Sequence, residues 1–227
     1  MIIKKLHSWT VTSAEAIEIQ RRLSKSVKIL PLKSKISSIA GADVSFKDGY
    51  AFGAVFVMTF PSLELIESVV SKVKITFPYV PTLLTFREGP VLCKCLESLK
   101  SNPDLVIFDG QGIAHPRAMG LASHLGILLN TPTIGCAKSH LWGKWRMPGN
   151  KKGCFSYIEG RTGTAVGAVL RTRERVKPIF ISPGHRIDVD GSIAILLKCA
   201  TKYRIPEPIR MSHKLCTDYK KGSADCI

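Results

Sequence analysis

The chain has 227 residues, of which 45% are hydrophobic and 22% are charged, and this composition excludes intrinsically disordered and fibrous proteins. Its 33 lysines and arginines outnumber its 17 acidic residues and give a formal net charge of +16, which favours a polyanionic partner, first of all nucleic acid. On charge alone, a generally basic surface and an anionic membrane surface stay open as alternatives.

The first half of the sequence predicts two helices separated by β-strands. Thr12 with Glu15, and Thr85 with Glu88, each form a capping-box pattern ahead of apolar residues at helical spacing. The segments between the two helices are β-rich, and the short link at 47–49 favours an antiparallel hairpin. The three expected strands cover residues 39–46, 50–58 and 63–75.

The second half of the sequence predicts further strands and helices. An apolar run at 105–109 has no polar alternation, which is typical of a buried parallel strand. Pro116 stands at the favoured first position of a helix whose leucines continue to Leu129. This order predicts one α/β domain over residues 1–227, a mixed sheet flanked by helices, antiparallel at first and parallel later. The remaining expected elements are strands at 133–137, 155–158, 166–171 and 179–182, and helices at 189–203 and 208–220.

The sequence carries no signal for export or for a membrane. Its start lacks the apolar core of a secretory signal, and no apolar run approaches the roughly 20 residues that span a bilayer. We therefore expect a cytoplasmic monomer without a membrane partner. Seven cysteines without paired zinc-type spacing are expected to be reduced and mostly buried.

Two carboxylates occupy positions where the local pattern favours hydrocarbon side chains. Asp43 interrupts the apolar strand 39–44, and Asp109 ends the apolar run 105–109. Burying a lone carboxylate is costly, and a Mg²⁺ ion, which prefers carboxylate and phosphate oxygens, compensates that cost. The alternatives are that Asp109 only begins a turn and that Asp43 lies at the surface of an edge strand.

Three other polar residues have both a functional and a structural interpretation. Glu88 completes a capping box with Thr85, which needs no catalysis. His213 has the spacing of a histidine packed against the core, and Lys138, just after the strand at 133–137, is also explained as a solvated lysine. The residue pattern by itself leaves these alternatives open.

The segment Pro78-Tyr79-Val80-Pro81 is stiffened by a proline at each end and presents an aromatic ring on a basic protein. Such a ring stacks on bases, at about 1 to 3 kcal/mol per base, or enters the gap left by a nucleotide that is flipped out. The alternative is an extended connector whose tyrosine packs on its own domain.

Several segments together resemble the endonuclease V family, the deoxyinosine-specific repair nucleases. The resemblance runs from about Leu6 to Lys221 with little change in length. The segments that carry it are ADVSF (42–46), FPYVP (77–81), LTFREGP (84–90), FDGQGIAHPR (108–117), TIGCAKS (133–139), SPGH (182–185) and RIPEP (204–208).

The resemblance implies a ribonuclease H-like fold with the strands of Asp43 and Asp109 side by side. It also implies that Asp43 and Asp109 ligate Mg²⁺, for which Mn²⁺ substitutes, with Glu88 holding the ion directly or through water. His213 would lie close by as a metal ligand or a group that orients water, and Lys138 would offset charge growing on the phosphate or leaving oxygen.

The implied substrate is DNA containing deoxyinosine, cleaved at the second phosphodiester bond on the 3′ side to leave a 3′-OH and a 5′-phosphate. Inosine-containing RNA is an alternative substrate. A non-catalytic binder of deaminated or mismatched nucleic acid is an alternative of another class, but its signature would be the loss of a metal carboxylate. Asp43, Glu88 and Asp109 are all present.

For base recognition, the resemblance assigns residues 78–81 as the wedge that replaces the flipped hypoxanthine. Thr82 departs from the glycine that relatives often carry beside the pocket, which puts strict inosine preference in question. Arg87 either contacts phosphate or supports the site. The remaining residues implied to face nucleic acid are Leu84, Gly110, Gly112, His115, Leu121, Gly135 and Leu141.

Overall fold

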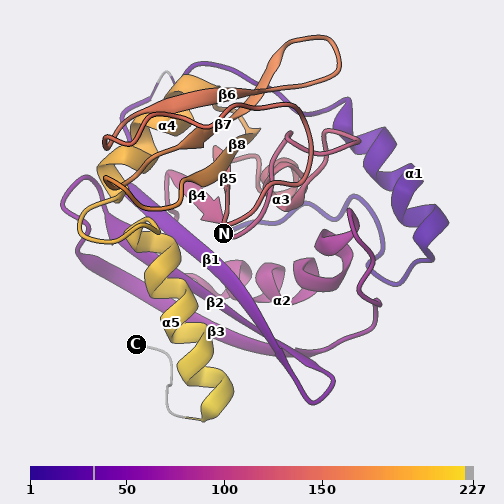
Figure 1. Cartoon of the computed structure of the whole chain (residues 1–227). Coiled ribbons are helices and arrows are strands. Elements are labelled where there is room, and N and C mark those ends of the chain that lie inside the picture. The colour runs from indigo at the N-terminus through magenta and orange to yellow at the C-terminus, as the bar shows by residue number, and fades with distance from the viewer. Residues whose placement is uncertain (33, 223–227) are drawn as a thin grey trace.

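In the computed structural model, which describes residues 1–32 and 34–222, eight strands form one mixed sheet in the order β3-β2-β1-β4-β5-β8-β7-β6 (Figure 1). The strands are β1 (Ser38–Lys47), β2 (Tyr50–Thr59), β3 (Leu65–Lys74), β4 (Leu105–Phe108), β5 (Thr133–Ala137), β6 (Phe155–Glu159), β7 (Ala165–Leu170) and β8 (Ile179–His185). The helices are α1 (Ser13–Ser24), α2 (Leu84–Ser98), α3 (Leu121–Leu129), α4 (Val189–Cys199) and α5 (Glu207–Lys221).

Strand β1 lies where the sheet changes from antiparallel to parallel. It pairs antiparallel with β2, which confirms the predicted hairpin, and parallel with β4 on its other side. Strands β4 and β5 continue the parallel part. Strands β8, β7 and β6 then return to antiparallel pairing, so the expectation of a parallel second half is correct only for β1, β4 and β5.

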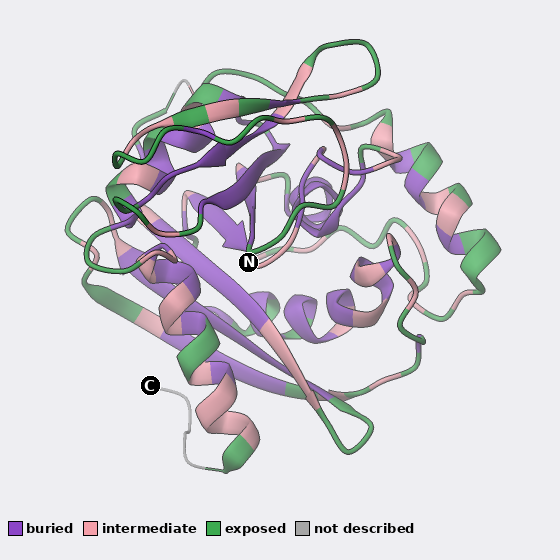
Figure 2. Ribbon diagram, in the orientation of Figure 1, coloured by how far each residue is buried: buried purple, intermediate pink, exposed green. Residues whose placement is uncertain are grey.

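Helices cover both faces of the sheet, as the sequence pattern predicts. Successive side chains of a strand point to opposite faces, and in β1 this places Ile39 in one core and Ala40 in the other. The first core contains residues of α4 and α5, and the second contains residues of α2 and α3. Figure 2 shows the resulting buried centre of the sheet, and α1 packs outside α3.

A close backbone contact places α5 across β1. A Cβ atom at Gly41 would lie 2.0 Å from the carbonyl oxygen of Pro208, near the start of α5. Only glycine permits this approach, because any side chain would collide with backbone that cannot move aside. Helix α5 therefore crosses the sheet two residues from Asp43.

Two predicted helix starts are wrong, and one is confirmed. The capping box of Thr12 and Glu15 forms at the start of α1. The second one does not, because α2 already begins at Leu84, so that Thr85 and Glu88 both lie inside the helix. Pro116 does not begin α3 either. That helix starts at Leu121, after a turn in which Ala118 has a left-handed φ of 51°.

The described cysteines are reduced, and all of them except the half-buried Cys154 are buried, as expected. Cys226 lies outside the described residues. Burial raises the pKa of Cys199 to about 12, which keeps that thiol in its unreactive form. No described helix is long and apolar enough to cross a membrane.

Candidate active site

Asp43 and Asp109 lie side by side on the sheet. Strands β1 and β4 pair in parallel up to Ala42 and Phe108, and the backbone amide of Asp109 donates to the carbonyl oxygen of Ala42 at 3.1 Å. The side chains of Asp43 and Asp109 are 8% and 17% exposed. Because β1 is a central strand, the edge-strand interpretation of Asp43 is wrong.

Each of these carboxylates has a cationic or ring-nitrogen partner. His213 of α5 donates through Nδ1 to Oδ2 of Asp43 at 2.6 Å, and the Nζ of Lys138 donates to Oδ2 of Asp109 at 2.5 Å. The His213 side chain is 57% exposed, so the interpretation as a packed core histidine is wrong. The exposed Lys138 is likewise tied to a carboxylate and is not merely solvated.

The electrostatics of the cluster oppose its full ionisation. Burial, and then the charge of Asp109, raise the pKa of Asp43, although the bond from His213 opposes this. Burial would lower the pKa of Lys138, but its hydrogen bond to Asp109 and the charge of that carboxylate outweigh burial and raise it. The lysine is therefore a permanent cation beside two carboxylates.

Glu88 reaches the same centre from α2, on the other side of the sheet. It is 8% exposed and has no hydrogen-bond donor among the described residues, which excludes the capping-box interpretation. Burial, followed by the charges of Asp43 and Asp109, raises its pKa well above the usual range. Asp43, Asp109 and Glu88 together are called the carboxylate centre below.

The carboxylate centre offers oxygen donors without closing into a complete ligand cage. Across residues 1–32 and 34–222, no three His, Cys, Asp or Glu side chains converge as a ready-made metal site. Such an open arrangement fits Mg²⁺, which is held by one or two carboxylates and takes its other ligands from water and substrate phosphate.

A pocket of about 350 Å³ adjoins the carboxylate centre, within the roughly 300 to 1,000 Å³ of small-molecule sites. It extends from Asp109 and Lys138 to the segment at 79–82. The predicted pocket residues Leu84, Gly110, His115, Leu121 and Leu141 line it, whereas Gly135 does not. Three other residues predicted to face nucleic acid, Pro78, Arg87 and Gly112, also lie outside its lining.

Tyr79 projects from the rim of this pocket. Its side chain is 69% exposed, among the most exposed large apolar side chains in the described part of the chain. The interpretation as a tyrosine packed on its own domain is therefore wrong. The ring lies at the edge of the pocket, and its flanking prolines restrict the backbone that carries it.

Hydrogen bonds from Gln20, His115 and Arg117 fix the position of Thr82. Its φ of 70° lies in the left-handed region that favours glycine. Its carbonyl oxygen accepts hydrogen bonds from Gln20 at 2.9 Å, from Nε2 of His115 at 2.9 Å and from Arg117 at 3.2 Å, and Arg117 also donates to the Thr82 hydroxyl at 2.5 Å. Burial, and then the charge of Arg117, lower the pKa of His115 to about 4, so the ring is neutral and rigidly placed.

Gly135 lies outside the pocket lining and allows close packing behind it. A Cβ atom at Gly135 would lie 2.5 Å from the amide nitrogen of Gly112 and 2.6 Å from the carbonyl oxygen of Gly110. The loop after β4 thus lies directly on β5, which keeps its backbone polar groups near the pocket.

The structure places Arg87 in a supporting position. Its guanidinium donates to the carbonyl oxygen of Phe77 at 2.9 Å and lies 4.7 Å from the ring centre of Phe46. Pattern reasoning missed other pocket residues, namely Gln111, Ser139 and His140. Their positions in the sequence could have identified them, because they directly follow Gly110 and Lys138. Residues after the ends of neighbouring parallel strands lie at the same edge of the sheet.

Comparisons with known proteins agree on one family. A family model described as Endonuclease V matches residues 21–214. The Endonuclease V of Methanothrix thermoacetophila is 47% identical over 215 residues, covering 95% of each chain. That of Thermosipho melanesiensis is 48% identical over 221 residues, covering 97% of each chain.

Solved structures confirm the fold. The structure of Endonuclease V from Bacillus subtilis matches with a TM-score of 0.90 at 32% identity, covering 98% of this chain and 100% of that one. A Ciona intestinalis Endonuclease V, solved with a 24mer DNA containing an inosine followed by a ribo-adenosine, matches with a TM-score of 0.81 at 29% identity over 93% of this chain and 98% of that one. The predicted ribonuclease H-like mixed sheet is thereby confirmed.

Proposed function

The chain belongs to the endonuclease V family and is a nuclease, and from this premise we propose that it recognises deoxyinosine in DNA and cleaves the second phosphodiester bond on the 3′ side, leaving a 3′-OH and a 5′-phosphate. The observation that carries the proposal is the joint position of the carboxylate centre and the pocket, which meet at Asp109 and Lys138. A cleavage centre that adjoins a base-sized pocket suits an enzyme that cuts beside the base it reads.

The donor set fits a divalent cation, and Mg²⁺, with Mn²⁺ as a substitute, is the ion that we propose. Asp43 and Asp109 would hold it, and Glu88, whose pKa responds to the charges of both aspartates, would bind it directly or through water. Burial first, and then the charges of neighbouring carboxylates, raise the pKa values of Asp43 and Glu88. A bound cation would offset both effects. When bound, the ion would polarise the scissile phosphate and lower the pKa of an attacking water.

The chain's own side chains supply the remaining chemistry. Lys138 places a fixed positive charge beside Asp109, where it stabilises charge that develops on the phosphate or the leaving oxygen. His213 is exposed and held in one orientation by Asp43. Its other ring nitrogen, Nε2, has no partner within residues 1–32 and 34–222 and would bind and orient water.

Base recognition rests on the pocket and its rim. Gly110 and Gln111 line the pocket, and Gly135 allows their loop to pack closely on β5; their backbone would read a base edge without a charged side chain. The neutral His115 and the carbonyl of Thr82 fix the opposite wall. Tyr79 stacks in the space that the flipped nucleotide leaves.

The proposal is tested with matched oligonucleotides that contain one inosine or one adenine, as DNA and as RNA, with Mg²⁺ or with EDTA. Cleavage is expected only with inosine and metal, at a single position on its 3′ side, mapped at nucleotide resolution. Equal cutting of adenine substrates would contradict inosine recognition, and cutting in EDTA would contradict the metal assignment. Cleavage restricted to the RNA substrate would replace DNA by RNA in the proposal.

Glu88→Gln is expected to stabilise the metal-free protein at neutral pH. The pKa of Glu88 is raised in the folded state, so its contribution to stability is full below the pKa of the unfolded chain and is lost as pH rises through the folded value. The neutral glutamine avoids that loss. A change of about 1 kcal/mol shifts Tm by roughly 2 to 4 °C in a chain of this size, so a rise of this order is expected near pH 7.5 and none near pH 4.

The measurement is thermal unfolding of both proteins from pH 4 to 8, in EDTA and in Mg²⁺. Magnesium should raise the Tm of the wild type more than that of Glu88→Gln, and more at high pH than at low pH, because ligands must be deprotonated. Glu97→Gln, an exposed position on the same helix, is the matched control and should change neither result. A lower Tm for Glu88→Gln at every pH would show that Glu88 has a structural role.

A further inference from the structure

A row of basic and aromatic side chains continues the sheet face that carries Asp43. Alternation along β1 places Asp43, Ser45 and Lys47 on one face, and the contact of Ser45 Oγ with Cys216 Sγ at 3.2 Å shows that this is the face under α5. Lys47 is paired with Tyr50 of β2, and Phe52 is paired with Lys72 of β3. The face thus changes from acidic to basic away from Asp43.

Helix α5 contributes to the same region. His213, Lys220 and Lys221 are spaced by seven and eight residues, so they lie on one side of the helix. Below them, Tyr219 packs edge to face on Phe52 with ring centres 5.8 Å apart. The helix therefore extends from the carboxylate centre to Lys220 and Lys221, which join Lys47 and Lys72 of the sheet.

A hollow of about 450 Å³ at this end of the face shares no residue with the pocket beside Asp109. Its lining is Lys47, Asp48, Tyr50, Phe52, Lys72, Tyr219, Lys220, Lys221 and Gly222. Lys72 Nζ lies 4.2 Å from the ring centre of Tyr50, which is 37% exposed. None of the lysines forms an ion pair within the described chain, and Asp48 is the one acidic residue of the lining. We call Lys47, Tyr50, Lys72, Lys220 and Lys221 the basic platform.

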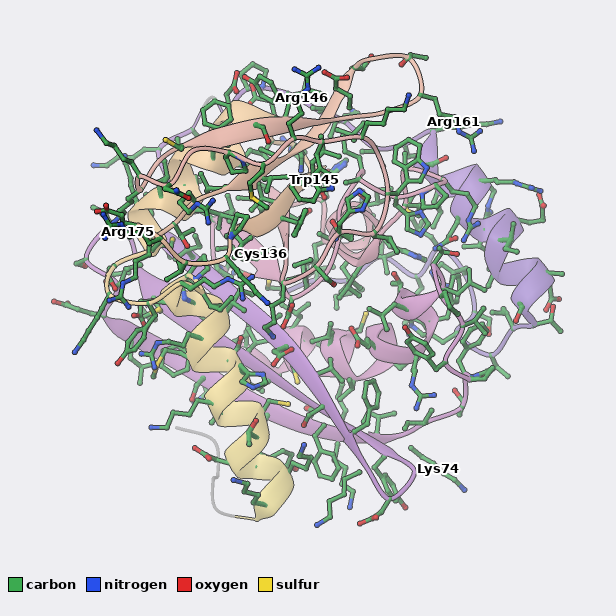
Figure 3. All side chains as sticks on the ribbon, in the orientation of Figure 1. Lys74, Cys136, Trp145, Arg146, Arg161 and Arg175 are labelled. Carbon is green, nitrogen blue, oxygen red and sulfur yellow. The ribbon has the colours of Figure 1, made fainter. Side chains whose placement is uncertain are left out.

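The platform lies on the opposite side of Asp43 from the base pocket. In the strand order, β4 and the pocket are on one side of β1, and β2 and β3 with the platform are on the other. Lys47 is four residues after Asp43 along the strand, which is about 13 Å at roughly 3.3 Å per residue. Figure 3 shows the labelled Lys74, paired with Tyr50 across β2 and β3, projecting outward at this end of the sheet.

We propose that the basic platform binds the phosphodiester backbone of the DNA flank that leaves the cleavage centre on the side away from the base pocket. The inference rests on the proposed function, because it takes DNA as the substrate. Lysines without an ion-pair partner attract phosphates whatever the base sequence is. The distance of about 13 Å from Asp43 to Lys47 corresponds to roughly four nucleotides at about 3.4 Å each. The platform contributes affinity and register on the DNA, and no base specificity.

The test compares two triple variants with the same loss of charge. Lys47→Ala/Lys72→Ala/Lys221→Ala removes platform lysines, and Lys4→Ala/Lys5→Ala/Lys94→Ala removes exposed lysines around a different hollow, next to α2 on the other face of the sheet. Binding to a DNA duplex with one inosine is measured by fluorescence anisotropy in EDTA, over a range of salt concentrations. Each lost phosphate contact lowers the slope of log K against log salt by about 0.9.

The platform variant is expected to lose about 2 to 3 units of that slope, as three lost contacts require, and the control variant to keep the wild-type slope. Lys47→Arg/Lys72→Arg/Lys221→Arg should also keep it, because the charge is retained. Equal losses in the platform and control variants would overturn the inference, since net charge alone would then explain binding. A salt slope that is unchanged in both variants would also overturn the inference. Thermal unfolding confirms that each variant is folded.

Shortened substrates locate the contact. The flank that leaves the cleavage centre away from the base pocket is cut to about two nucleotides, fewer than the roughly four that the distance from Asp43 requires. The affinity of the wild type for this DNA should then fall to that of the platform variant. The platform variant should not respond to the same cut. Loss of affinity by both proteins to the same degree would contradict the inference. Because the contact is with backbone, the result should be the same with adenine in place of inosine, so failure of inosine recognition and failure of the platform are distinguishable.

Discussion

Asp43→Asn and Asp109→Asn are each expected to lower cleavage by on the order of 10³-fold or more while preserving DNA binding. The exchange keeps the shape of the side chain and removes a charged oxygen donor, and metal stabilisation of a phosphoryl transition state is worth several kcal/mol, at about 1.4 kcal/mol per tenfold change in rate. Binding in EDTA should be equal or tighter, because a negative charge facing the phosphates has been removed. Single-turnover cleavage and anisotropy measure the two effects separately.

Asp190→Asn is the matched control for these variants. Its carboxylate is exposed and accepts a hydrogen bond from Tyr157 at 2.9 Å, away from the carboxylate centre, so cleavage should stay at the wild-type rate. Full activity of both Asp43→Asn and Asp109→Asn would refute the assignment of the centre. Loss of binding together with cleavage would indicate that the fold has been damaged.

Tyr79→Ala is expected to reduce inosine-dependent cleavage of duplex DNA by about 5- to 150-fold. The range corresponds to stacking of about 1 to 3 kcal/mol per base, and the ring is free to stack because it is 69% exposed. The loss should be smaller on single-stranded DNA, where less unstacking has to be compensated. The measurement is kcat/KM on duplex and single-stranded substrates with inosine or adenine.

Two further variants separate the wedge role from loss of an exposed ring in general. Tyr79→Phe keeps the ring and should behave as the wild type. Tyr157→Ala removes a ring that is 42% exposed on β6 and should leave cleavage unchanged. Equal losses for Tyr79→Ala on duplex and single-stranded DNA would make Tyr79 a residue that shapes the pocket, without a wedge function.

Local patterns predicted much of the sheet, and part of the site. The hairpin of β1 and β2 follows from a short turn between alternating segments, and strand period two already places Asp43 and Lys47 on one face. The pairing of β1 with β4 was expected only from the family resemblance, because a parallel contact between segments distant in sequence leaves no local signal. Without that pairing, Asp43 and Asp109 are two unrelated acids.

Tertiary contacts explain the errors. Pro116 suits a helix start, but the neighbouring His115 accepts hydrogen bonds from the backbone amides of Arg117 and Met119 at 3.2 and 3.4 Å, which holds this segment in a turn. Thr85 and Glu88 have capping-box spacing, yet the segment before them supplies the first helical residue. Short-range sequence patterns show which groups are able to form hydrogen bonds. They do not show which partners the fold brings to those groups.

The pairing of β1 with β4 has a consequence for how this nuclease folds. The polypeptide between Asp43 and Asp109 contains β2, β3, the tyrosine segment and α2 with Glu88, so the carboxylate centre closes a long loop. Non-local parallel contacts of this kind form slowly, because chain entropy is lost before they are made. A chain emerging from the ribosome or opened by partial unfolding therefore has no assembled centre, and cutting activity arises only with the completed sheet.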